Sequence, residues 1–402
     1  MFKYFERFKT YPPFFDKKIS KNCGIIVTIP CYDDEDVFLT LNSLNSAQHP
    51  KCDTEVIVAV NSAENTPENI VQKNRKIFEK LKTLSAQQNF FFELSPFLLE
   101  NVAKKIAGVG NARKAAMDEA ARHFLQLNKP NGIIAGLDCD CLVSKNYFIE
   151  IENNFEQNTD IQLFTFNFQH NFDEKRFSTQ EILACKMYET YLRYYRLALL
   201  AAGFPHAFHT IGSCFAVTAL AYAKAGGMAR LQAGEDFYFI HKTVPFAKHG
   251  AIKQKIVFPA PRISDRVPFG TGKAVQKIIA ENKYLVYNFA LFDILKRFFN
   301  SFATNTPFPK EIIEYFGEEK LQKIIGEAAA NSKYNAQYIN RLYTKFNAFF
   351  IVRFLNSFNA SNAFPPQELT TAAKSLLHQY NISADTFDNI FEKIDKLDFE
   401  LL

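Results

Sequence analysis

The stretch NGIIAGLDCDCL, residues 131–142, is the part of this sequence that says most about the fold. Its apolar residues 133–137 predict a buried strand that ends in an acidic segment. Side chains alternate between the two faces of a strand, so Asp138 and Asp140 are expected on one face and the two cysteines on the other. Two like charges at a strand end repel unless a cation lies between them, and carboxylate oxygens suit Mg²⁺ or Mn²⁺. An ordinary acidic loop is the alternative, because Asp-x-Asp is a common pattern.

The flanking sequence alternates between strand and helix patterns. Strands are predicted at residues 24–30, 55–60 and 90–94, and helices at 36–46, 67–84 and 111–125, with Asp33 or Asp34 placed to cap the first helix. This alternation predicts an α/β fold, with a mostly parallel sheet covered by helices on both faces. Ligands of such sheets bind at the carboxyl ends of the strands, where Asp138 and Asp140 are expected.

Length and composition limit the possible classes of protein. A chain of 402 residues with 48% hydrophobic content exceeds the usual size of one core, so two domains are expected. The net charge of +5 is too small to indicate nucleic acid as a partner. Seven scattered cysteines without a signal peptide favour reduced thiols in a cytoplasmic protein. Zinc at Cys139 and Cys141 is disfavoured because no second cysteine pair follows at finger spacing.

Two segments raise the question of membrane contact. Residues 197–223 lack Asp, Glu, Lys and Arg, but Gly, Pro and His interrupt them too often for a continuous spanning helix. The first fifteen residues, MFKYFERFKTYPPFF, mix basic and aromatic side chains and could contact a membrane surface. A short helix or arm packed on the core is an equally good interpretation.

Four segments together resemble the family 2 glycosyltransferases. They are IPCYDDEDVFLTLNSL (29–44), GNARKAAMDEA (110–120) followed by GIIAGLDCDC (132–141), HTIGSCFAVTALAYAKAGGM (209–228) and LQAGEDFYFIHK (231–242). Each segment is a weak signal, but the order and spacing of the four are specific. The resemblance spans roughly residues 24–272 and implies a nucleotide-diphospho-sugar transferase with the GT-A fold, a Rossmann-like mixed sheet.

The resemblance implies roles for the acidic residues. Asp138 and Asp140 would hold Mn²⁺ or Mg²⁺ for the leaving diphosphate, and Asp236 would be the base that deprotonates the acceptor hydroxyl. Glu235 would orient the acceptor or hold a helix N-terminus. Simple helix capping after Gly234 is the alternative for this acidic pair.

The nucleotide-sugar donor is expected at the ends of the first two strands. Pro30, Tyr32 and Glu64 are the candidates there, although this chain has Asn61 and Glu64 where the family often has Asp. Arg113 could reach the nucleotide or the acidic segment, and an exposed helical arginine is nearly as good an interpretation.

Two later features could complete the donor site. The segment PRISDRVPFGTGK, residues 261–273, carries Arg262 and Arg266 beside a Gly-x-Gly turn, and such a loop can close over a diphosphate. A basic linker between domains is the alternative. His249 is a candidate third metal ligand, because a late histidine completes the metal site in some GT-A enzymes, although a lone histidine is more often structural.

Beyond residue 273 the pattern is helical, with apolar residues at helical spacing in 275–299, 310–330 and 334–358. The predicted organisation is an N-terminal arm (1–23), a GT-A glycosyltransferase domain (24–275) and a helical accessory domain (276–402). The accessory domain could bind acceptor, partner or membrane, and its sequence does not choose between them.

The sequence thus predicts a metal-dependent glycosyltransferase of polysaccharide biosynthesis, in the cytoplasm at the inner membrane face. Its acceptor would be a glycan or lipid-linked sugar, and inversion at the anomeric carbon is implied by the resemblance alone. A non-catalytic sugar-nucleotide or glycan-binding module is one alternative, which the two acidic motifs disfavour. A metal-dependent nucleotidyltransferase is another, but the loop after the first strand, CYDD (31–34), is acidic and lacks the glycines of that class.

Overall fold

The computed structural model describes residues 1–264, 266, 270–304, 306–359 and 363–402. These residues form two compact units. Unit 1 comprises Met1–Cys185, His209–Gln276 and Leu402, and unit 2 comprises Lys186–Phe208 and Lys277–Leu401. The domain boundaries expected from the sequence stay a prediction, because a compact unit need not fold by itself.

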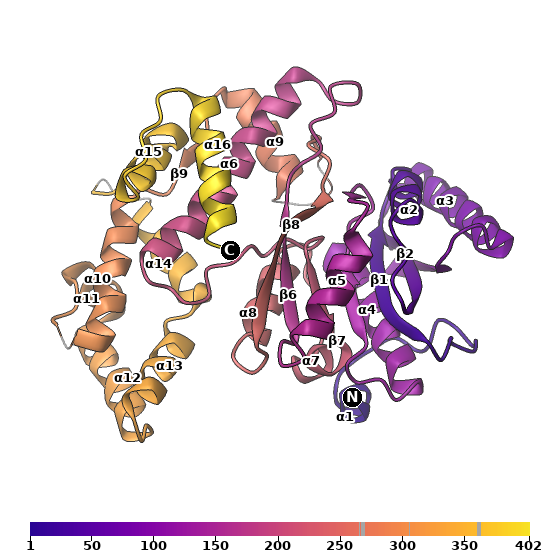
Figure 1. Cartoon of the computed structure of the whole chain (residues 1–402), viewed down its shortest axis with the longest axis horizontal. Coiled ribbons are helices and arrows are strands. Elements are labelled where there is room, and N and C mark those ends of the chain that lie inside the picture. The colour runs from indigo at the N-terminus through magenta and orange to yellow at the C-terminus, as the bar shows by residue number, and fades with distance from the viewer. Residues whose placement is uncertain (265, 267–269, 305, 360–362) are drawn as a thin grey trace. The chain divides into compact units, whose positions relative to one another are not determined.

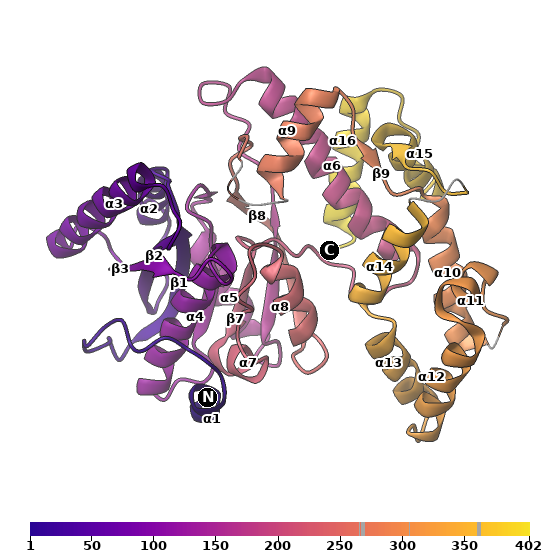
Figure 2. The ribbon, with the colours of Figure 1, turned by 180° about the vertical axis from the view of Figure 1, so that it is seen from behind.

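Unit 1 contains an eight-stranded sheet within the described residues, drawn in Figures 1 and 2. Strand pairing shows that β7 and β5 run against the other six strands. The predicted fold class, a mostly parallel mixed sheet followed by a helical C-terminal region, is confirmed. In sheet order the strands are β3 (Glu93–Val102), β2 (Asp53–Ala63), β1 (Cys23–Cys31), β4 (Ile133–Gly136), β7 (Phe215–Thr218), β6 (Leu163–Phe168), β8 (His249–Phe258) and β5 (Leu142–Val143).

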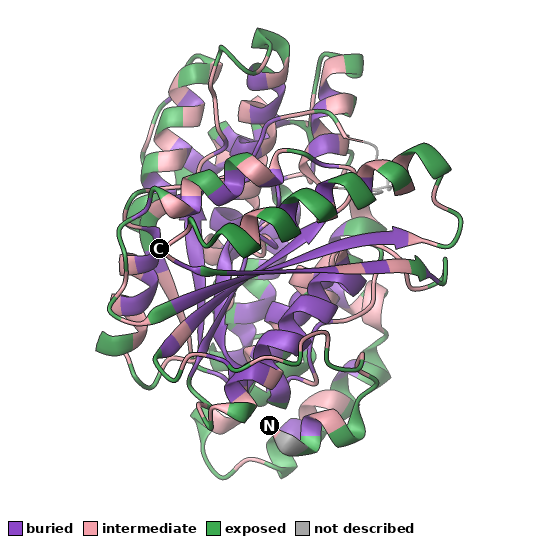
Figure 3. Ribbon diagram, turned by 90° about the vertical axis from the view of Figure 1, so that its right-hand side faces the viewer, coloured by how far each residue is buried: buried purple, intermediate pink, exposed green. Residues whose placement is uncertain are grey.

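The central strands are buried on both faces, as Figure 3 shows by their purple colour. Their near-continuous apolar runs are typical of parallel strands covered by helices on each side. The strands predicted at 24–30, 55–60 and 133–137 correspond to β1, β2 and β4. The strand predicted at 90–94 begins three residues later than expected, because the phenylalanine rings at 90–92 pack on one another and on Phe148 before β3 begins.

Helices cover both faces of the sheet (Figure 3). The order β3-β2-β1-β4 means that the chain steps outward through β2 and β3 and then returns to β4. Right-handed crossovers therefore place α2 and α3 on one face and α4 on the other. The described helices up to residue 281 are α1 (Phe2–Arg7), α2 (Val37–Asn45), α3 (Glu68–Gln87), α4 (Val109–Gln126), α5 (Tyr147–Gln157), α6 (Thr179–Ala201), α7 (Ala219–Lys224), α8 (Glu235–Thr243) and α9 (Thr271–Glu281). Most of α6 and the end of α9 belong to unit 2.

The N-terminal segment packs against α4 and the edge of the sheet. The Tyr4 hydroxyl donates to Asp118 Oδ1 at 2.5 Å, and the Phe14 ring stacks on Phe97 with centroids 3.9 Å apart. Lys17 Nζ reaches Glu55 Oε1 at 2.7 Å. These contacts explain why α4 is buried along most of its length, with the sheet on one side and the arm on the other.

The described residues of unit 2 are helical apart from one pairing of two-residue strands, β9 (Leu285–Val286) with β10 (Gln367–Glu368). Each long helix predicted there is split in two, and residues with positive φ mark two of the breaks, Asn282 (49°) and Gly317 (84°). The further helices are α10 (Ala290–Thr304), α11 (Lys310–Phe316), α12 (Glu318–Ala330), α13 (Asn335–Lys345), α14 (Ala348–Asn359), α15 (Leu369–Gln379) and α16 (Phe387–Glu400).

Buried charge joins two helices inside unit 2. Arg193 on α6 is fully buried and contacts Glu189 Oε1 at 2.9 Å and Asp398 Oδ2 of α16 at 3.4 Å. A buried charge without partners is strongly unfavourable, so the contact between Arg193 and Asp398 holds the two helices together, while Glu189 balances the charge from within α6. Among the described helices of the whole chain, none is both long and apolar enough to cross a membrane.

Candidate active site

Acidic side chains gather where β1 and β4 end. The two strands are parallel and adjacent, with Thr28 opposite Gly136, so the segments that leave them run side by side. One segment carries Asp34, and the other carries Asp138 and Asp140. The strand ends at Gly136 and a turn follows, in which the Cys141 N–H donates to the Asp138 carbonyl at 3.2 Å. Exposure still alternates as expected, since the Asp138 and Asp140 side chains are 34% and 22% exposed and both cysteines are buried.

Arg113 on α4 connects three parts of this region. Its Nη2 donates to Asp138 Oδ1 at 2.7 Å, its Nε to Glu235 Oε1 at 3.0 Å, and its Nη1 to the Gly212 carbonyl at 2.8 Å. Arg113 is 2% exposed, which rules out the exposed helical arginine considered above. Burial alone would lower the pKa of Arg113, but the charges of Asp138, Glu235 and Asp236 raise it above its ordinary value.

Gly110 and Gly212 allow close contacts around Arg113, because a side chain at either position would clash with a neighbour. A Cβ on Gly212 would lie 2.5 Å from Arg113 Nη2, and a Cβ on Gly110 would lie 2.4 Å from the Leu231 carbonyl oxygen. Both distances are shorter than real Cβ contacts allow. The first turn of α4 therefore packs directly against the segment that leads into α8.

Glu235 and Asp236 begin α8, directly after Gly234, whose φ is 75°. Glu235 is 2% exposed and its carboxylate is bonded to Arg113. Asp236 is half-buried, and its Oδ1 accepts from the Phe237 N–H at 2.7 Å. Burial and the neighbouring charge of Glu235 raise the pKa of Asp236 to about 7, against the lowering effect of Arg113. The two adjacent carboxylates therefore stand in different electrostatic surroundings.

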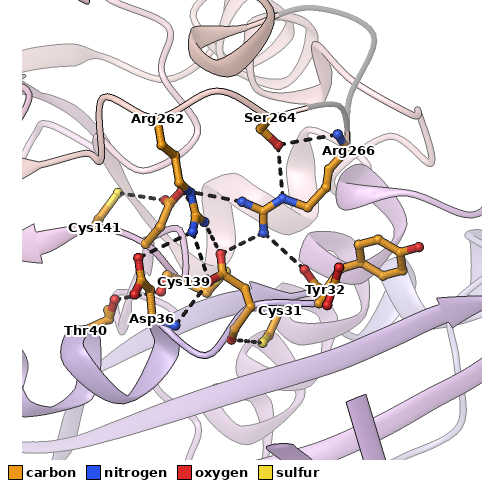
Figure 4. A network of polar contacts seen from close by, with 12 residues as sticks. Cys31, Tyr32, Asp36, Thr40, Cys139, Cys141, Arg262, Ser264 and Arg266 are labelled. Carbon is orange, nitrogen blue, oxygen red and sulfur yellow. Dashed lines mark hydrogen bonds and ion pairs between the residues drawn. The ribbon is translucent and has the colours of Figure 1, made fainter. Parts of the chain in front are cut away.

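Arg262 and Arg266 lie over the acidic turns, as Figure 4 shows. Arg262 Nη2 contacts both Asp34 Oδ2 and Asp140 Oδ2, the latter at 2.9 Å. Arg266 Nη1 donates to Asp34 Oδ2 at 2.7 Å and to the Tyr32 carbonyl at 3.1 Å. The predicted loop 261–273 thus meets the acidic segment, but its last three residues belong to α9, which begins at Thr271. Residues 265 and 267–269 lie outside the described residues.

Asp34 is a member of this cluster that the sequence indicated only as a helix cap. That cap is not formed, because Asp36 is the residue that precedes α2, and the Asp34 Oδ1 accepts from the Asp36 N–H at 3.1 Å, outside the helix. The side chain is buried, and burial would raise its pKa, but the hydrogen bonds and charges of Arg262 and Arg266 lower it. An acidic residue four positions after the predicted strand end was the available signal. Its arginine partners, more than 200 residues later in the chain, were not visible from it.

Three other predicted residues lie apart from this cluster or contribute little to it. Pro30 is buried within β1, opposite Ala59 of β2. Glu64 follows β2, where its Oε1 accepts from the Lys104 N–H at 2.9 Å. His249 is the first residue of β8, opposite Leu163 at the start of β6, and its Nε2 lies 2.9 Å from Thr165 Oγ1. Because β8 runs parallel to β4, His249 is at the opposite end of the strands from Asp138 and Asp140.

A divalent cation suits the donor atoms present. Mg²⁺ and Mn²⁺ are held by one or two carboxylates together with substrate phosphates, and Asp138 and Asp140 are the partly exposed carboxylates that could hold such a cation. Burial and the charges of Asp138 and Asp34 raise the pKa of Asp140. A nearby cation would reduce the repulsion between these carboxylates and so lower that pKa. No group of three or more His, Cys, Asp or Glu side chains with metal-binding geometry occurs among the described residues.

Comparisons with known proteins give weak structural similarity. The sequence matches no protein-family model and no curated protein. A structure of S. aureus TarS 1–349 in complex with UDP-GlcNAc is 13% identical and covers 83% of this chain and 90% of that chain, with a TM-score of 0.42. A mannosyltransferase from Pyrobaculum calidifontis in complex with GDP-Man and Mn²⁺ is 13% identical and covers 89% and 91%, with a TM-score of 0.36. Because both TM-scores are low, we base the function on the geometry of the site.

Replacing Arg113 by methionine should destabilise the protein. The change leaves Glu235 without its buried cation, and breaking such a pair costs about 3–5 kcal/mol. Arg75→Met is the matched control, because its pair with Glu100 is half-exposed and should contribute at most about 1 kcal/mol. Urea unfolding of both variants measures the difference. Equal losses of unfolding free energy would show that Arg113 does not organise the site.

Proposed function

We propose that this chain is a nucleotide-diphospho-sugar glycosyltransferase with the GT-A fold. The observation that carries the proposal is Arg113, which bonds Asp138 at the end of β4 and Glu235 beside Asp236 at the start of α8. Sugar transfer needs a group that neutralises the leaving diphosphate and a base for the acceptor hydroxyl. Asp138 with Asp140 supports the first role and Asp236 the second, and Arg113 holds the two sets of residues at one edge of the sheet.

Asp236 is the better base of the two adjacent carboxylates. Glu235 is buried and committed to Arg113, whereas Asp236 is half-buried and its pKa of about 7 lies near working pH. A general base works best when its pKa is close to the operating pH. Glu235 then acts as a positioning residue, held by Arg113 at the first turn of α8. Transfer with inversion follows if the deprotonated hydroxyl attacks the anomeric carbon opposite the diphosphate.

Donor binding would use the acidic turns and the arginines above them. Asp138 and Asp140 would hold Mn²⁺ or Mg²⁺, which when bound neutralises charge on the diphosphate. Arg262 and Arg266 carry guanidinium groups that match phosphate oxygens well. Pro30, Tyr32 and Glu64 remain candidates for contacts to the nucleotide, and His249 is left out of the proposed metal site because of its position.

The acceptor in this proposal is a glycan or lipid-linked sugar. The enzyme would act on it in the cytoplasm, at the inner face of a membrane, as part of polysaccharide biosynthesis. UDP-, GDP- and dTDP-sugars should be screened for thermal stabilisation with and without Mn²⁺, since a ligand of the native state raises its stability. A protein that no nucleotide sugar stabilises would contradict the proposal. A protein that is stabilised but shows no turnover with any acceptor or water would be the non-catalytic binding module.

The cation site is tested by Asp138→Asn and Asp140→Asn. Each change removes one anionic ligand, so stabilisation by a nucleotide diphosphate that depends on Mn²⁺ should be abolished. Asp53→Asn is a control, because it removes an exposed carboxylate at the opposite end of β2. Thermal melting with Mn²⁺ and nucleotide diphosphate, separately and together, gives the comparison. Full Mn²⁺-dependent stabilisation of either site variant would show that the cation is held elsewhere.

The role of Asp236 is tested by Asp236→Asn and by the pH profile. Loss of a general base should lower kcat at least about 100-fold with donor affinity nearly unchanged. In the wild type, kcat/KM should rise as pH increases through about 7, where Asp236 becomes ionised.

The raised pKa of Asp236 also predicts the stability of the Asp236→Asn variant, and a melting measurement then shows whether lost activity is due to unfolding. The pKa of Asp236 is raised on folding, so its contribution to stability is present below the unfolded pKa and is lost as pH rises through about 7. At pH 8 the Asn variant should therefore melt no lower than the wild type. Near-normal turnover of Asp236→Asn would move the base to another residue, with Glu235 the next candidate.

Asp34→Asn tests whether Asp34 competes with the donor for the arginines. Arg262 and Arg266 share this carboxylate, so its removal should leave both guanidinium groups more available to a diphosphate. We expect inorganic pyrophosphate to bind more tightly in the presence of Mn²⁺, as measured by calorimetry. Weaker binding would mean instead that Asp34 positions the arginines for the donor.

A further inference from the structure

The outer side of α8 and the N-terminal segment together present aromatic and basic side chains. Phe8 is 43% exposed and Tyr238 is 49% exposed, and Arg7, Lys9 and Lys242 are exposed as well. We call these five residues the aromatic–basic surface. All of them belong to unit 1.

Packing brings the two segments of this surface together. Gly226 follows α7 with φ of 76°, and a Cβ there would lie 2.7 Å from Phe8 Cε1 and 3.2 Å from Lys242 Nζ. Phe8 and the Lys242 ammonium group are therefore neighbours, although they are distant in sequence. Tyr238 precedes Lys242 by four residues on α8, which places both on the same side of that helix.

The N-terminal segment is held in this place by specific contacts. Arg230 Nη2 donates to the Lys9 carbonyl at 3.0 Å, and Tyr4 is buried with its hydroxyl bonded to Asp118. The Tyr4 and Phe8 rings lie 5.3 Å apart. The backbone of the arm is fixed while the side chains of Arg7, Phe8 and Lys9 remain exposed, so the surface is formed before any partner binds.

We propose that the aromatic–basic surface binds the anionic face of a lipid bilayer. Basic side chains are attracted to anionic headgroups, and aromatic rings insert at the level of the headgroups, so the combination is typical of peripheral membrane contact. A soluble polyanion would require the charges alone and would leave the exposed rings without a role. Glu6 is the acidic residue of α1, and the three basic residues of the surface outweigh it.

The position of the surface links it to the candidate active site. The helix α8 carries Asp236 in its first turn and Tyr238 and Lys242 on another side of the same helix, so one helix carries both the base and part of the surface. If the proposed function holds, an acceptor anchored in the bilayer would meet the enzyme on the side of α8. Binding to lipid does not itself depend on sugar transfer, so the two proposals fail separately.

Vesicle flotation tests the surface without donor or acceptor. The full chain should bind vesicles of phosphatidylcholine mixed with phosphatidylglycerol and should not bind phosphatidylcholine alone. Neutralising the three basic residues (Arg7→Gln, Lys9→Gln and Lys242→Gln) should weaken binding roughly 100-fold, at roughly fivefold for each charge. Replacing both rings (Phe8→Ala and Tyr238→Ala) should weaken binding roughly tenfold or more with all charges kept.

The matched control neutralises three exposed lysines of α3 (Lys76→Gln, Lys80→Gln and Lys82→Gln), which lies on the other face of the sheet. This variant has the same net charge as the triple charge variant and should keep wild-type binding. All variants change exposed residues, and unchanged melting temperatures would confirm that they fold. The proposal is overturned if anionic vesicles do not bind, if the two triple variants lose binding equally, or if the ring variant binds vesicles like the wild type. It is also overturned if dextran sulfate binds the ring variant and the wild type alike and displaces vesicles from both.

Discussion

The buried guanidinium of Arg113 is the constraint on which the site depends. It bonds to a turn after β4, to the first residue of α8 and to the backbone before β7. A buried cation is tolerated only when its charge is balanced and its N–H groups are bonded. The position of the acidic turn and the position of α8 are therefore coupled, and neither can shift without leaving charge unpaired.

This arrangement also gives two adjacent carboxylates different properties. Glu235 forms an ion pair with Arg113, and its negative charge also lies beside Asp236. A helix N-terminus favours the ionised form of Asp236, but burial and the charge of Glu235 outweigh that effect and raise its pKa. Pairs of acidic groups in unlike surroundings are a common way for one site to supply two roles at neutral pH.

Much of the fold could be predicted from the sequence because its signals are local. Apolar runs located β1, β2 and β4, and helical spacing located α2, α3 and α4. The rule that parallel strands end at one edge brought Asp138 into the same region as the residues after β1. Contacts between residues far apart in the chain could not be predicted in this way. Nothing local distinguishes the shared carboxylate of Asp34 from a helix cap, since its partner Arg262 lies in another loop.

The position of His249 also could not be predicted from the local sequence. Its place after α8 suggested a metal ligand, but the end of the sheet at which it lies depends on where β8 begins. Some helix ends in unit 2 could not be predicted from the spacing of apolar residues, because they depend on the backbone conformation of single residues. Apolar residues continue across Gly317, whose left-handed backbone ends one helix and starts another.

The balance of charge in the site explains why a cation and arginines can serve the same carboxylates. The carboxylates are Asp34, Asp36, Asp138, Asp140, Glu235 and Asp236, and the guanidinium groups that contact or face them are Arg113, Arg176, Arg262 and Arg266. Six acids against four bases leave two negative charges when Asp236 is ionised, which is the charge that one divalent cation neutralises. Arg262 already contacts Asp140, so a cation at that carboxylate has to displace it or share it.

A diphosphate changes that competition in a definite direction. It adds negative charge beside Arg262 and Arg266, and its oxygens offer these guanidinium groups a bidentate partner that Asp34 and Asp140 would no longer need to supply. The cation and the diphosphate should therefore favour each other's binding, because each compensates for the charge that the other disturbs. Mutual dependence of metal and donor follows from the arrangement of charges, without any change in the fold of the sheet.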